Sequence, residues 1–181
     1  MNHTALMEAL QSQQGQQRLG HLYGHRDDAV QRQTARYTAL ISRHAALFGP
    51  QENVLIVSAP GRTEIVGNHT DHNRGRVLAA AINLDTLAVV SLREDMVVNL
   101  HSEGYPAITM DLSDLAPHPE ERETTAALIR GVADGLHRRG YRADRVQVEA
   151  PLKENLAAAL LSLLFAGLGF RKRPVPKKLF E

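Results

Sequence analysis

The chain has 181 residues, 43% of them hydrophobic, which is enough for the packed core of one domain or slightly more. Its 21 basic and 20 acidic residues nearly cancel, so the charge gives no footprint for nucleic acid, and we expect small-molecule partners. Cysteine is absent, which excludes disulfides and thiolate metal sites. The first four residues lack the features of a signal peptide, and we expect a cytoplasmic protein.

The N-terminal region is polar and low in complexity, with a glutamine-rich stretch at residues 11–17. This composition predicts a mobile arm, or a loosely attached helix, over residues 1–26. Residues 27–48 then place apolar side chains on one helical face, with two aspartates at the start and Gly49-Pro50 as a stop. They predict a packing helix.

Short β-branched and apolar runs separated by turn-forming residues predict strands in the middle of the chain. A second amphipathic helix is expected over residues 126–139, with basic residues near its end and Gly140 as its C-terminal cap. Together these elements predict an α+β domain over residues 27–150. The expected strands are residues 54–59, 77–82, 86–92, 97–101, 107–112 and 146–149.

Residues 58–73 read S-A-P-G-R-T-E-I-V-G-N-H-T-D-H-N, a polar segment between two apolar runs. We expect these side chains at strand ends, where the glycines allow the backbone to fold tightly around a small polar molecule. A purely structural turn is one alternative, because Asn, Asp and Thr side chains bond the local backbone. A metal site at His69, Asp71 and His72 is another, but no further ligand appears at a recognisable spacing, so no metal ligand is assigned.

The same segment resembles the sugar-binding signature of the galactokinases, within the GHMP kinase family. The match is carried by Pro60-Gly61-Arg62, Gly67, His69-Thr70-Asp71 and Asn73. The resemblance implies an α+β fold like the N-terminal half of a GHMP kinase, with a mixed sheet and packing helices. This chain departs from the family at Asn68, where relatives have a sugar-contacting glutamate, and at His72, where they have tyrosine.

The resemblance also implies a reaction, in which ATP phosphorylates galactose at its C1 hydroxyl and Mg²⁺ neutralises phosphate charge. Arg62 takes the place of the catalytic arginine near that hydroxyl, where a guanidinium stabilises developing negative charge. Ser102 lies where relatives contact the nucleotide. The implied substrate-binding residues are Arg62, Gly67, Asn68, His69, Thr70 and Asp71.

Residues 151–181 depart from the resemblance. Relatives carry a glycine- and serine-rich loop around the ATP phosphates at this point, whereas this chain reads P-L-K-E-N-L-A-A-A-L. We therefore expect an aberrant tail, from a truncated or frameshifted product, and no phosphorylation by the chain alone. The apolar residues 156–170 are too few to span a membrane and predict a short buried helix. A non-catalytic sugar-binding or regulatory module, or a product without function, are the alternatives.

Overall fold

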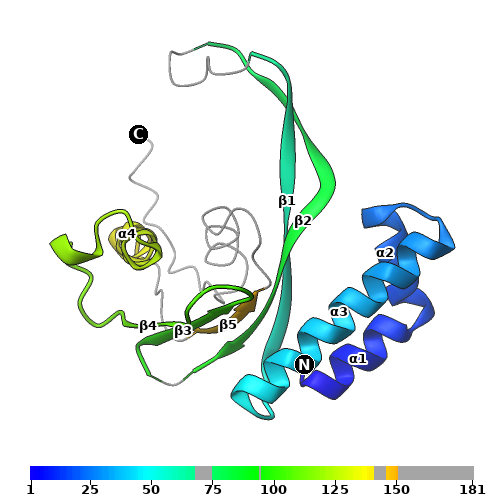
Figure 1. Ribbon diagram of the computed structural model, residues 1–181, viewed down its shortest axis with the longest axis horizontal. Coiled ribbons are helices and arrows are strands. Elements are labelled where there is room, and N and C mark those ends of the chain that lie inside the picture. Colours follow the sequence, from blue (N-terminus) through cyan, green and yellow to red (C-terminus); the bar gives the residue numbers. More distant parts are fainter. Residues whose placement is uncertain (68–74, 94, 141–145, 151–181) are drawn as a thin grey trace.

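The computed structural model of the chain describes residues 1–67, 75–93, 95–140 and 146–150, the last of these by their backbone alone. The described residues form three layers, in which a central sheet has helices on both faces (Figure 1). Three helices cover one face, α1 (His3–Gln11), α2 (Gln13–Tyr23) and α3 (Asp27–Phe48). The other face carries α4 (Thr125–Arg138).

The sheet is mixed. Its strands are β1 (Val54–Val66), β2 (Leu78–Leu92), β3 (Val97–Ser102), β4 (Ile108–Asp111) and β5 (Val146–Ala150). They lie in the order β1-β2-β5-β3-β4, with β3 and β5 parallel and the other neighbours antiparallel. The predicted α+β fold, with its mixed sheet and packing helices, is confirmed.

The core lies on both sides of β2, because successive side chains of a strand point to opposite faces. Leu87 and Val89 are buried beneath α1 to α3, whereas Ala88 and Val90 are buried beneath α4. The first cluster contains Leu10, Leu19, Tyr23, Tyr37, Leu40, Ile41, Val54, Leu87 and Val89. The second contains Val57, Ala88, Val90, Val98, Leu100, Met110, Leu112, Ile129, Ala133 and Leu136.

The two helices predicted from apolar periodicity are present. α3 spans the predicted range, with two aspartates in its first turn, where they suit the helix dipole, and Gly49 at a φ of 72° after its last residue. α4 begins one residue before the predicted start, because Thr124 caps it by accepting a hydrogen bond from the backbone N–H of Ala127.

Residues 1–26, expected to form a mobile arm or a loosely attached helix, contain two helices that pack with α3. The Asn2 and Ser12 side chains cap α1 and α2 by accepting hydrogen bonds of 2.9 and 3.1 Å from first-turn N–H groups. Leu10, Leu19 and Tyr23 are buried in the cluster with α3. The glutamines lie mostly on the exposed sides of these helices, so the polarity of the sequence reflects solvent contact.

β1 and β2 form a ribbon longer than predicted, whose outer half extends beyond the rest of the sheet (Figure 1). β1 continues past the predicted residues 54–59 to Val66, so the polar segment begins within a strand. The strands predicted at 77–82 and 86–92 are joined in β2. The pairing is irregular between Pro60 and Arg62 of β1, which is the signature's first part.

A buried carboxylate lies at this irregularity. Asp85 of β2 pairs with Pro60, and its side chain is only 3% exposed. Tyr23 Oη donates to Asp85 Oδ2 over 2.6 Å, and the hydroxyl of Ser58 donates to the same oxygen. Arg36 donates to Asp85 Oδ1 over 2.6 Å and to its backbone carbonyl over 2.8 Å. The Tyr37 hydroxyl lies 2.9 Å from that of Tyr23.

These contacts set the charge state of the cluster. Burial alone would raise the pKa of Asp85, but hydrogen bonds from Ser58, Tyr23 and Arg36 outweigh it and hold the pKa below its usual value of 3.8. Burial, together with the bond to Asp85, raises the pKa of Tyr23. Asp85 is therefore an anion at neutral pH and Tyr23 its neutral donor.

The lowered pKa predicts how Asp85 contributes to stability in acid. A carboxyl group with a depressed pKa in the folded state stabilises that state above its unfolded pKa, and this contribution disappears as the pH falls through the folded pKa. The difference in unfolding free energy between wild type and Asp85→Asn should therefore be full at pH 6 and shrink below pH 3.8. Urea denaturation at pH 6 and in acid measures it. A difference that stays constant into strong acid would contradict this expectation.

Candidate functional site

Arg62 lies on the outer half of β1, paired in register with Ala81 of β2. Its side chain is 70% exposed and forms an ion pair of 3.3 Å with Glu64. Residues two apart in a strand share a face, which explains the contact. An exposed ion pair of this kind adds little stability, so the guanidinium is available to a ligand.

Gly67 follows β1 in a conformation that requires glycine. Its φ is 91°, and a Cβ atom at this position would lie 2.2 Å from the carbonyl oxygen of Arg76. The backbone entering the signature's second part thus lies against the backbone leaving it. The two ends of the polar segment therefore lie side by side.

Four predicted sugar-binding residues, Asn68, His69, Thr70 and Asp71, lie outside the described residues. Their roles stay predictions, as does the expected clustering of residues 67–73 with Arg62 on one concave side. Arg62 and Gly67 are on the same ribbon. Ser102 is elsewhere, at the end of β3.

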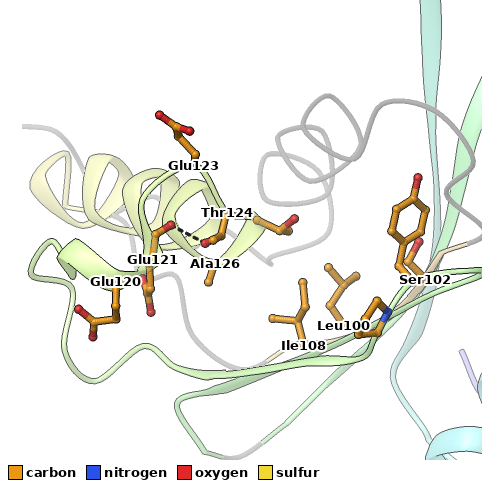
Figure 2. A pocket seen from close by; sticks show the side chains of 11 residues that line it. Leu100, Ser102, Ile108, Glu120, Glu121, Glu123, Thr124 and Ala126 are labelled. Atoms are coloured by element: carbon orange, nitrogen blue, oxygen red, sulfur yellow. Dashed lines mark hydrogen bonds between the residues drawn. The ribbon is translucent and has the colours of Figure 1, made fainter.

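Ser102 lines a cavity of about 530 Å³ between the ends of β3 and β4 and the start of α4 (Figure 2). Leu100 and Ile108 form an apolar floor from the sheet, and Figure 2 shows Thr124 and Ala126 facing it from the other side. The Ser102 hydroxyl is buried, and the described residues offer it no hydrogen-bond partner. A buried hydroxyl without a partner in a cavity is suited to a polar atom of a ligand.

One cavity wall is fixed by a buried ion pair. Arg130 of α4 donates to both carboxylate oxygens of Glu121, over 2.6 and 2.8 Å, and lies 3.2 Å from the carbonyl oxygen of Asp111. It also donates to the carbonyl of Asp114. The hydrogen bond from Arg130 lowers the pKa of Glu121. Thr124 donates to the Glu121 carbonyl over 2.5 Å (Figure 2), so the short helix η2 (Pro119–Glu121) is tied to α4.

The cavity residues around η2 and the start of α4 were not predicted from the sequence. The available signal was Thr124, a helix-capping residue directly before an amphipathic helix. Nothing local indicated that this helix start would face Ser102, because the two are brought together by the sheet. The acidic lining, with Glu120, Glu121 and Glu123, disfavours phosphate groups and leaves the apolar floor as the recognition surface.

Two further features concern the described residues, namely membrane-spanning helices and metal-binding clusters. No helix among them is long and apolar enough to cross a membrane. In the same part of the chain, no three His, Asp or Glu side chains gather in a way that could hold a metal ion.

The polar segment and its flanking strands match a known family model. The galactokinase galactose-binding signature matches residues 42–92, a range that runs from α3 through the whole β1–β2 ribbon. The chain is related to the galactokinases.

The galactokinase of Lactococcus lactis subsp. cremoris is 31% identical over 139 residues, which cover 72% of this chain and 34% of that protein. The galactokinase of Clostridium perfringens is 36% identical over 101 residues, covering 54% of the chain and 25% of that protein. The crystal structure of Lactococcus lactis galactokinase complexed with galactose superposes with a TM-score of 0.66 at 28% identity, over 77% of this chain and 38% of that one. The chain thus spans about a third of the length of the Lactococcus lactis galactokinases that it matches.

Proposed function

We propose that the chain binds galactose through the signature of residues 60–73 and provides the sugar side of an ATP-dependent phosphorylation at the C1 hydroxyl. The observation that carries this proposal is the signature match on the β1–β2 ribbon. The similar solved structure, which is a galactose complex, supports it.

The proposed sugar contacts follow from the chemistry of hydroxyl groups. An ionised carboxylate accepts hydrogen bonds from two hydroxyls at once, and its placement distinguishes one epimer from another. Asp71 has this role in the proposal, with His69, Thr70 and Asn68 completing the polar lining. Gly67 supports it, because its backbone lies close to that of Arg76, which places the two ends of this segment side by side.

Arg62 is the proposed catalytic residue. Its exposed guanidinium is held by Glu64 on the same strand face, which limits its range of orientations. Such a cation stabilises the negative charge that develops when the C1 oxygen attacks a phosphate.

ATP is the proposed phosphoryl donor, and the cavity beside Ser102 is its proposed base-binding site. The residues fit a nucleoside, since an apolar floor suits a ring and the unpartnered Ser102 hydroxyl suits a ring nitrogen or a ribose hydroxyl. ATP supplies the transferred phosphoryl group when bound. The described residues contain no cluster of carboxylates and imidazoles that would hold a magnesium ion. A cytoplasmic location completes the proposal and agrees with the absence of cysteine.

The role of Arg62 predicts a selective effect of Arg62→Ala. Galactose affinity should fall about five-fold, because one hydrogen bond contributes about 1 kcal/mol. The melting temperature should stay unchanged, since the side chain is 70% exposed. Arg32→Ala is the matched control, because Arg32 is 69% exposed and also pairs with a carboxylate, but lies on α3. Titration calorimetry should show an effect for Arg62 alone, and equal losses in both variants would contradict the assignment.

A non-catalytic sugar-binding module is the second candidate function, because the chain covers only about a third of the length of its relatives. An assay for galactose 1-phosphate formed by the purified chain with ATP separates the two candidates. Product that is lost in Arg62→Ala identifies a catalyst. Saturable galactose binding without product identifies a binding module.

A further inference from the structure

The Asp85 cluster, defined as Tyr23, Arg36, Tyr37, Ser58 and Asp85, joins four elements at one point. It links α2 and α3 to β1 and β2 through the contacts described above. The signature match contains both Ser58 and Asp85, yet neither is among the predicted sugar-binding residues. The cluster therefore lies within the signature match but apart from the predicted sugar contacts.

The cluster lies where the pairing of β1 and β2 becomes irregular. Asp85 and Pro60 form the last regular pair before the register changes, and the next pair is Arg62 with Ala81. One residue of β1 thus faces three of β2, so the ribbon cannot continue straight through this point. Here Gly61 packs closely, since a Cβ atom on it would lie 3.2 Å from the carbonyl oxygen of Leu84.

Arg36, on α3, binds the irregular part of β2 from the helical layer. Its guanidinium bonds both the carboxylate and the backbone carbonyl of Asp85, which fixes the backbone as well as the side chain. Ser58, two residues before Pro60, bonds the same carboxylate from the partner strand. Beyond this point the ribbon packs little, because Ile65, Val66 and Leu78 are all more than half exposed. The direction of the outer ribbon is therefore set where Asp85 holds it.

We propose that Asp85 is a positioning residue for the sugar site, which fixes the bend of the β1–β2 ribbon and thereby the orientation of Arg62 and the position of Gly67. This inference rests on the proposed galactose-binding function. Asp85 does not touch the sugar. It acts through the backbone of Pro60 to Arg62.

Asp85→Asn tests the proposal, with Leu10→Ala as the control. Leu10 is buried in the hydrophobic core cluster that contains Tyr23, but it belongs to α1 and is not a member of the Asp85 cluster, so its loss should destabilise the fold without removing a contact to Asp85. Amide hydrogen exchange and galactose titration are measured on both full-length variants. In Asp85→Asn, the rate of amide hydrogen exchange within residues 61–66 should rise about ten-fold, and galactose affinity should fall about ten-fold. Changes of this size correspond to the loss of one hydrogen bond to a charged group.

Leu10→Ala should lower the melting temperature. It should leave the amide exchange of residues 61–66 and the affinity for galactose unchanged. Equal exchange and equal affinity in the two variants would overturn the proposal. If Asp85→Asn does not fold, Ser58→Ala removes one donor to the same carboxylate and should give the same changes at about three-fold. A wild-type chain that binds no galactose overturns the proposed function instead, and the exchange measurement then decides alone whether Asp85 fixes the bend.

Discussion

Ile41→Ala is expected to lower the free energy of unfolding by about 2 to 5 kcal/mol. Ile41 of α3 is 0% exposed and packs with Tyr37, Leu40 and the β2 residues Leu87 and Val89. Removing its outer carbons leaves a cavity between the helical layer and the sheet, and well-packed surroundings close such a cavity only in part. The ribbon that carries the signature rests on this layer, so its inner half should lose stability with the helices.

Leu47→Ala is the matched control for this prediction. Leu47 lies on the same helix and loses the same number of carbon atoms, but its side chain is 43% exposed. Its substitution should change the unfolding free energy far less, by about 1 kcal/mol or under. Urea denaturation of both variants provides the comparison. Comparable losses in the two would show that α3 is not packed as the structure has it.

The sequence predicted elements well where local signals were complete. Residues 27–48 have acidic residues at one end, Gly49-Pro50 at the other and an apolar face between them, and α3 has those bounds. The break expected between the strands at 77–82 and 86–92 was wrong, since β2 runs through it. Aspartate is depleted in strands and common in turns, so Asp85 is unusual within a strand. Here its carboxylate is satisfied by Tyr23, Arg36 and Ser58, so the residue stays within β2.

The site was predictable only where residues are adjacent in the sequence. Arg62 and Gly67 were predicted from one contiguous signature and stay predictions as sugar-binding residues, and the structure explains the glycine by its φ of 91°. The cavity beside Ser102 and the Asp85 cluster join residues from separate elements. Their members share no local pattern, since only the packed sheet and helices bring them together.

Asp71→Ala is expected to weaken galactose binding by about ten-fold to a hundred-fold. A hydrogen bond between a charged group and a hydroxyl contributes about 1.5 to 3 kcal/mol, and its loss lowers affinity by about ten-fold to a hundred-fold. Asp71 holds the carboxylate position of the signature, and the family match covers it. The proposal expects the melting temperature to change little, since a carboxylate that serves a ligand adds little to the core.

Asp28→Ala is a suitable control for the lost charge. Asp28 is an exposed aspartate at the start of α3, bonded to Arg32 over 2.7 Å, and it lies outside the signature match. Its substitution should leave galactose affinity unchanged. A structural turn at residues 68–73 makes the opposite forecast for Asp71→Ala, namely a lower melting temperature with unchanged affinity.

The proposal that this chain binds galactose through its signature is tested most directly by calorimetric titration of galactose into wild type and Asp71→Ala, with a melting curve recorded on each. The proposal predicts saturable binding by the wild type and a loss of at least about ten-fold in the variant at an unchanged melting temperature. Absence of binding by a folded wild-type chain, or equal affinity in the two proteins, would contradict it.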